Sequence, residues 1–140
     1  MSKSERVLIG GCLCGAVRYE ATGEPLFSGF CCCGDCRRAS GAGAVPYMGF
    51  PKDSFRVRRV TKQARKRLLR GGESVRNFCP ECGSLLFGGE YGLREQHTVY
   101  AGTLDDPSAF RPTHAVMTAE RAPWAAVLDG LTLHDGLPKP

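Results

Sequence analysis

The spacing of the cysteines is the feature that most constrains the fold of this chain. All eight cysteines lie in three short segments, residues 12–14 (Cys-Leu-Cys), 31–36 (Cys-Cys-Cys-Gly-Asp-Cys) and 79–82 (Cys-Pro-Glu-Cys), and seven of them have the spacing of zinc ligands. A structural zinc site is closed by four protein ligands, whereas a catalytic site keeps three and leaves one position open. Seven ligands therefore predict one closed and one open site.

The closed site is predicted from the outer two segments. Cys79 and Cys82, followed by a glycine, can fold back as a knuckle on one edge of a metal ion. A redox motif of the same spacing would need a following helix, but residues 84–87 are predicted as a strand. Two thiolates cannot complete a tetrahedron, so we pair them with Cys12 and Cys14 as the ligands of a structural zinc ion.

The open site is predicted from the middle segment. Cys31 and Cys33 share one face of an extended chain, and Cys36 returns to them after a turn. Cys32 points the other way and is interpreted as a buried free thiol. The alternative is that Cys32 is a redox-sensitive thiol next to the metal ion. Water or a substrate would take the fourth position, which agrees with a catalytic zinc ion. In an alternative closure that position is taken by a histidine, namely His97, His114 or His134.

Two arginines follow the last cysteine of the open site. Arg37 and Arg38 are candidate substrate-binding residues, because a guanidinium group can grip a carboxylate with two hydrogen bonds. The alternative is that both are solvated or paired structurally. Core packing is predicted for four aromatic residues, with the lining of a pocket as the alternative: Phe30, Tyr47, Phe50 and Trp124.

The rest of the chain predicts a cytoplasmic protein with reduced thiols. The apolar run at 7–9 is too short for a signal peptide, and no stretch approaches the roughly 18–20 apolar residues that cross a bilayer. Clustered cysteines in such a protein more often bind metal than form disulfides, which are the alternative interpretation.

Short runs of β-branched and aromatic residues, separated by 18 glycines and 9 prolines, predict an all-β fold with few or no long helices. The chain is expected to form a single domain, 1–140, with an ordered core at about 6–135. Short helical turns are expected at 37–40 and 123–128, and 62–70 fits either a strand or a basic helix. Strands are predicted at 7–12, 15–21, 26–30, 44–50, 55–58, 64–69, 75–78, 84–87, 98–101 and 115–118.

A basic segment raises the question of nucleic acid. Residues 52–70 hold nine of the nineteen basic residues, opposed only by Asp53. With seven thiolates and two zinc ions, however, the formal charge of +5 falls to about +2. The segment also lacks stacking aromatic residues after Phe55 and the spacing of a groove-reading zinc finger. Nucleic acid is therefore kept only as an alternative partner.

Taken in order, the motifs resemble the glutathione-dependent formaldehyde-activating enzyme family, which includes the domain of centromere protein V. The resemblance covers nearly the whole chain, through residues 10–19, 31–38, 78–84, 102–107 and a tail with Trp124 and 129–131. It implies small stacked β-sheets held together by zinc, a β-tent-like fold. It also implies that Cys12, Cys14, Cys79 and Cys82 bind a structural zinc ion, and Cys31, Cys33 and Cys36 a catalytic one.

The resemblance implies a carbon–sulfur lyase that joins glutathione and formaldehyde as S-hydroxymethylglutathione. Cys32 departs from the family, which usually has a histidine at this position, so the substrate is expected to be glutathione or another small thiol. A zinc ion with three thiolate ligands is electron-rich, and we expect it to bind a thiol rather than to activate water. The alternative function is a zinc-containing module that binds nucleic acid or protein without catalysis.

Overall fold

The computed structural model describes residues 6–68, 71–125 and 130–138, and it confirms the all-β prediction. Ten strands and a single short α-helix, α1 (Gly34–Ser40), occur in this part of the chain, together with four 3-10 turns. The strands are β1 (Val7–Gly11), β2 (Arg18–Thr22), β3 (Phe27–Cys31), β4 (Val45–Pro51), β5 (Phe55–Arg58), β6 (Lys62–Arg67), β7 (Glu73–Phe78), β8 (Leu85–Gly88), β9 (Gln96–Tyr100) and β10 (His114–Val116). The 3-10 turns are η1 (Lys52–Ser54), η2 (Ala101–Thr103), η3 (Pro107–Ala109) and η4 (Thr118–Glu120).

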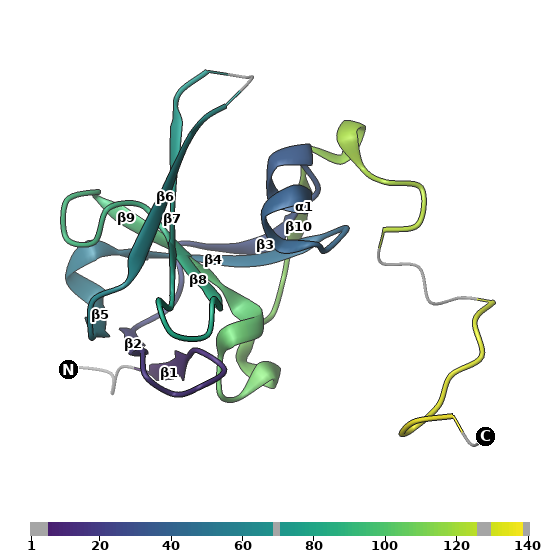
Figure 1. Ribbon diagram of the computed structural model, residues 1–140, viewed down its shortest axis with the longest axis horizontal. Helices are drawn as coiled ribbons and strands as arrows, with labels where there is room; N and C mark the ends of the chain where they lie inside the picture. Colours follow the sequence, from purple (N-terminus) through teal and green to yellow (C-terminus); the bar gives the residue numbers. More distant parts are fainter. Residues whose placement is uncertain (1–5, 69–70, 126–129, 139–140) are drawn as a thin grey trace.

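The strands form two sheets that pack against each other. The smaller sheet has the order β1-β2-β5, and the larger one the order β10-β3-β4-β9-β8-β7-β6. β10 joins the edge of the larger sheet in parallel to β3, whereas the other pairings in both sheets are antiparallel. In Figure 1 the smaller sheet lies below the larger one, while the β6–β7 hairpin and α1 rise from it on the opposite side.

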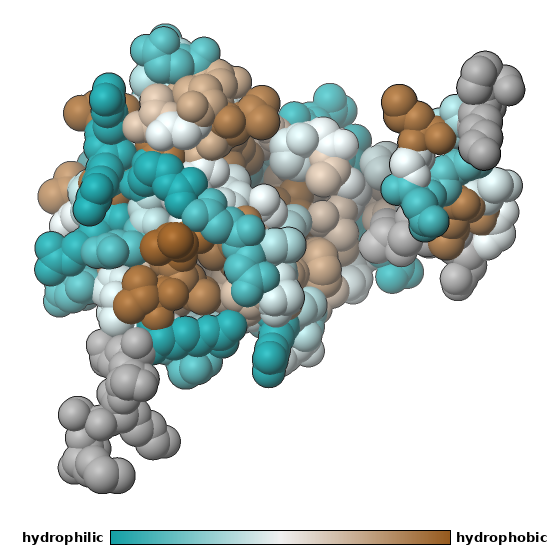
Figure 2. Space-filling model, turned by 90° about the horizontal axis from the view of Figure 1, so that it is seen from below, coloured by the Kyte–Doolittle hydropathy of each residue, from teal (hydrophilic) through white to brown (hydrophobic). Residues whose placement is uncertain are grey.

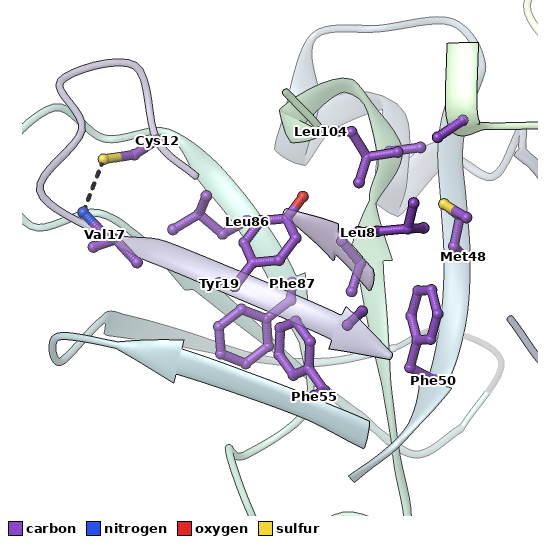
Figure 3. Packing of buried hydrophobic residues seen from close by; sticks show 14 of the residues in the cluster. Leu8, Cys12, Val17, Tyr19, Met48, Phe50, Phe55, Leu86, Phe87 and Leu104 are labelled. Atoms are coloured by element: carbon purple, nitrogen blue, oxygen red, sulfur yellow. Dashed lines mark hydrogen bonds between the residues drawn. The ribbon is translucent and has the colours of Figure 1, made fainter. Parts of the chain in front are cut away.

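The core fills the space between the sheets because alternate side chains of each strand point into it. Met48 and Phe50 of β4 meet Tyr19 of β2 and Phe55 of β5 there, together with Phe87 of β8 (Figure 3). Phe55 and Phe87 are edge to face, with ring centroids 4.9 Å apart. Burial of each such side chain contributes about 1.5–3 kcal/mol.

The four aromatic residues expected in the core lie in different environments. Phe50 is fully buried and belongs to the core. Phe30 packs edge to face on Phe110, and Tyr47 lines a cavity. Trp124 is 60% exposed, so core packing is wrong for this residue, whose ring covers Gly43.

Several predicted elements change their bounds. The helical turn expected at 37–40 begins earlier, because the Cys33 side chain caps α1 at its N-terminus. The helix ends as expected at Gly41, which has a φ of 77°. The ambiguous segment 62–70 is a strand, β6, up to residue 67. The turn expected at 123–128 is present at 123–125, and its remainder lies outside the described residues.

The surface is mostly polar. Seen from the side of β1, teal hydrophilic atoms surround a limited brown apolar area (Figure 2). β1 contributes Val7 and Ile9, each about half exposed, to the apolar surface. Among the described residues, no helix is long and apolar enough to cross a membrane.

Candidate metal centres and cavity

Four of the cysteines meet at the tip of the β1–β2 hairpin. Cys12 and Cys14 lie in its turn, and Cys79 and Cys82 lie in the turn between β7 and β8. The four sulfur atoms are within 4.8 Å of one another, with 3.6 Å between Cys12 and Cys14 and 3.8 Å between Cys14 and Cys79. A zinc ion at about 2.3 Å from each ligand would require sulfur atoms roughly 3.8 Å apart. The cluster therefore fits a tetrahedral metal ion.

Hydrogen-bond donors surround these sulfur atoms. The backbone N–H of Val17 donates to Cys12 Sγ (3.2 Å), and the Ser84 hydroxyl lies 3.2 Å from Cys82 Sγ. The hydrogen bond from Ser84 lowers the pKa of Cys82 to about 5. Donors of this kind stabilise thiolates and orient metal ligands.

The second cluster forms where β3 meets α1. Cys31 ends β3, Cys33 caps the helix, and Cys36 lies in its first turn, so that the three sulfur atoms are within 4.8 Å of one another. The backbone N–H of Cys36 donates to Cys33 Sγ (3.2 Å). Cys32 is buried and lies outside the cluster, and its N–H donates to the Val116 carbonyl of β10. Helix formation, rather than an isolated turn, therefore returns Cys36 to the other two.

The second cluster also fits a metal ion in its chemistry. The hydrogen bond with Cys31 and burial raise the pKa of Cys36, because three crowded thiols cannot all ionise without a balancing positive charge. Three soft sulfur ligands suit zinc. No fourth cysteine or histidine joins this cluster within the described ranges, so three ligands are available here and four in the first cluster.

A cavity of about 820 Å³ opens beside the three-cysteine cluster. Its floor is the face of the larger sheet that points away from the core, where Tyr47, Thr98 and Tyr100 lie. Cys31 and Cys36 are in its wall. A concave site of this size with a few convergent polar groups is typical of small-molecule binding.

Arg76 is the functional candidate that the sequence analysis missed. It lies on β7 and lines the cavity, with Nη2 3.9 Å from Cys36 Sγ and Nη1 2.9 Å from the Ser74 hydroxyl. Arg94 lines the same cavity. Neither arginine forms a salt bridge with a carboxylate in the described part of the chain. Three strands separate β7 from β3 in the larger sheet, so the fold of the whole sheet brings Arg76 to the 31–36 segment and no local motif signals it.

Arg37 and Arg38, the arginines predicted to bind substrate, occupy the last turn of α1. They are not among the described residues that line the cavity. Their meeting with a ligand carboxylate therefore stays a prediction.

The histidine closure of the second site is wrong for the residues that the structure describes. His97 is buried in the core, where Gly92 N–H donates to its Nε2 and its Nδ1 lies 3.1 Å from the Gly88 carbonyl. Burial lowers the pKa of His97. His114 bonds to the Tyr47 hydroxyl instead, and His134 joins neither cysteine cluster.

The basic segment contributes β5 and the edge strand β6, whose residues are all exposed. Arg65 of β6 forms ion pairs with Glu73 and Glu90, which neutralise part of the positive charge. The remaining basic side chains of β6 face solvent, as most charge runs do.

Comparisons with known proteins agree with this architecture. A crystal structure of a Rhodobacter sphaeroides protein is similar, with a TM-score of 0.54 and 23% identity over 76% of this chain and 98% of the other. At this identity the likeness concerns the fold alone. No curated protein matches the chain with significant sequence similarity. The model of the glutathione-dependent formaldehyde-activating enzyme family matches residues 7–120, which include both cysteine clusters. The chain therefore belongs to the glutathione-dependent formaldehyde-activating enzyme family.

Proposed function

We propose that this protein is a zinc-dependent enzyme of the carbon–sulfur lyase type that joins glutathione, or a related small thiol, to formaldehyde. The observation that carries the proposal is the cavity in which Cys31, Cys36 and Arg76 come together. Zinc held by Cys31, Cys33 and Cys36 would supply a site that binds a thiol and lowers its pKa. The four-cysteine cluster would hold a second, structural zinc ion.

Arg76 and Arg94 would recognise the substrate. A tripeptide thiol such as glutathione carries two carboxylates, and both arginines line the cavity. Arg76 lies beside Cys36 and would bind a carboxylate close to the reacting sulfur. The same positive charge would stabilise thiolates in this part of the site.

Exchange NMR with glutathione and ¹³C-formaldehyde at equilibrium tests the function. The wild-type protein is expected to accelerate the exchange between free formaldehyde and S-hydroxymethylglutathione. Arg76→Gln should raise the KM for glutathione by about 10-fold or more, because it removes one charge-assisted hydrogen bond to a substrate carboxylate. It should change the KM for 2-mercaptoethanol, which has no carboxylate, much less.

Matched variants locate the carboxylate site. Arg37→Gln and Arg38→Gln test the alternative sites on α1, and Arg111→Gln serves as an exposed control outside the cavity lining. If wild-type protein accelerates no exchange and added thiols leave the spectrum of a cobalt-substituted sample unchanged, the enzyme proposal fails. A zinc-containing binding module without catalysis would then be the better description.

A further inference from the structure

A chain of hydrogen bonds starts at the wall of the cavity and runs to the surface. Tyr47 of β4 lines the cavity together with Cys31 and Cys36. Its hydroxyl lies 2.7 Å from His114 Nε2 on β10, and His114 Nδ1 lies 3.1 Å from the Thr113 hydroxyl. The function proposed above assigns no role to these side chains.

The arrangement depends on a glycine between the two rings. His114 and Gly29 are partners in the β10–β3 pairing, and Gly29 and Tyr47 are partners in the β3–β4 pairing, so the three residues form one row across the sheet. A Cβ atom on Gly29 would lie 2.7 Å from His114 Nε2 and 2.6 Å from the His114 carbonyl oxygen. Gly29 therefore leaves the space through which His114 reaches Tyr47.

The number of available protons gives this hydrogen-bond pathway a direction. One arrangement of protons makes every contact a hydrogen bond: when the Thr113 hydroxyl donates to the Ser28 carbonyl (3.3 Å), it accepts from His114 Nδ1. Nδ1 then carries the proton of the neutral imidazole, and Nε2 is the acceptor. The Tyr47 hydroxyl consequently donates to Nε2, which leaves its oxygen lone pairs free to accept a proton from the cavity.

We propose that Tyr47 and His114 form a proton relay for the reaction, with Tyr47 as the catalytic residue that meets the substrate and His114 as the positioning residue behind it. This inference rests on the proposed function. The substrate thiol gives its proton to the Tyr47 oxygen while the Tyr47 proton passes to His114 Nε2. The sulfur lone pair forms the carbon–sulfur bond, and the π electrons of the carbonyl move to its oxygen. The relay then runs backwards and protonates that oxygen, so R–SH and CH₂O give R–S–CH₂–OH with no net change in the protein.

The surroundings of both side chains suit this role. The Tyr47 hydroxyl lies 2.7 Å from His114 Nε2, and its ring lines the cavity together with Cys31 and Cys36, which is the geometry that a relay needs. Within the described ranges, the His114 ring has hydrogen-bond contacts with Tyr47 from β4 and with the neighbouring Thr113. His114 is exposed on its edge strand, so its proton can also exchange with water. Imidazole is the side chain that most readily takes up and returns a proton near neutral pH.

Kinetics of two variants test the relay. Tyr47→Phe keeps the ring but removes the hydroxyl, and it should lower kcat in the exchange assay by about 100-fold while the KM for glutathione changes little. His114→Gln should cause a similar loss of kcat, because it interrupts the same pathway behind Tyr47. Tyr91→Phe, which removes a hydroxyl bonded to Val57 N–H, and His134→Gln are matched controls expected to behave as wild type. Wild-type kcat in both Tyr47→Phe and His114→Gln would overturn the inference.

NMR of the histidine rings provides a test that needs no turnover. Long-range ¹H–¹⁵N spectra should show His114 with Nδ1 protonated, and glutathione alone should shift the ring signals in wild type but not in Tyr47→Phe. An Nε2-protonated His114, or no response to glutathione in wild type, would contradict the relay. If the wild-type protein does not accelerate the exchange between formaldehyde and S-hydroxymethylglutathione, the proposed function fails. The NMR spectra still show, independently, whether a ligand in the cavity affects His114 through Tyr47.

Discussion

At the scale of single residues, His97 shows how a histidine can be structural rather than metal-binding. Its ring is fully buried among the rings of Phe55, Phe87 and Tyr91, with centroids 5.5–5.8 Å away. Both ring nitrogens are occupied, because Gly92 N–H donates to Nε2 and Nδ1 must therefore donate to the Gly88 carbonyl. The neutral imidazole thus satisfies two backbone groups in the core.

This environment predicts a pH-dependent stability. Burial, with a smaller effect of Arg94, lowers the pKa of His97 below 6.5 in the folded protein, so the unfolded chain binds the extra proton first. The stability that neutral His97 contributes is fully present above about pH 6.5, and it is lost as the pH falls through the lower pKa of the folded protein. His97→Gln should cost about 1–3 kcal/mol at pH 7.5.

Urea unfolding between pH 7.5 and 5.5 measures this effect. The difference between wild type and His97→Gln should shrink as the pH falls, since the titration of the metal ligands is common to both. His134→Gln should keep the wild-type pH dependence. An equal difference at pH 7.5 and 5.5 would contradict the prediction.

At the scale of elements, Ser84 joins the two turns that carry the four-cysteine cluster. Its hydroxyl accepts a hydrogen bond from Leu13 N–H (3.0 Å) in the β1–β2 turn and lies 3.2 Å from Cys82 Sγ in its own turn. The hydroxyl proton is therefore directed to the sulfur atom. In both turns a glycine with positive φ follows the second cysteine: Gly15 (82°) and Gly83 (78°).

Removal of this link should weaken both folding and metal binding. Ser84→Ala is expected to lower the free energy of unfolding by about 1 kcal/mol. It should lower the zinc affinity of the cluster by about 10- to 100-fold, as the loss of a group that orients a ligand does. Chelator competition measures the affinity. Ser108→Ala is the control, because the Ser108 hydroxyl bonds to Asp106 in its own turn, away from the cysteines. Equal zinc affinities in the two variants would argue against the link.

At the scale of the whole molecule, the two clusters have different importance for folding. Cys79 is fully buried and packs in the core, where its cluster ties the smaller sheet to the larger one. Cys36 lies on a seven-residue helix beside an open cavity. Loss of the first metal should therefore unfold the protein, whereas loss of the second should not.

Zinc content and thermal unfolding of two variants distinguish these roles. Elemental analysis of the reduced wild-type protein is expected to find two zinc ions per chain. Cys36→Ser should retain about one zinc ion and a Tm near that of wild type, while Cys79→Ser should lower the Tm by at least about 10 °C. Two zinc ions in Cys36→Ser, or a Tm for Cys79→Ser equal to that of wild type, would refute the assignment.

The features that depend on local chemistry could be predicted from the amino-acid sequence. The all-β class follows from short apolar runs between turn residues, and the grouping of the cysteines follows from their spacing, because a knuckle or a helix cap needs only a few neighbouring residues. Several strand ends nevertheless differ from the predicted ones, and the cap that Cys33 forms on α1 was not predicted.

Which distant side chains share the cavity depends on the tertiary fold and could not be predicted from local patterns. Arg76 lies 3.9 Å from Cys36 Sγ although three strands separate β7 from β3 in the larger sheet. His114 reaches Tyr47 because β10 pairs in parallel with β3 across Gly29. Strand order and parallel pairing join residues separated by dozens of positions, and they arise from packing of the whole chain rather than from any local pattern. For the same reason His97, one of three equivalent candidates in the sequence, is a core residue, because only its surroundings in the fold distinguish it from a ligand.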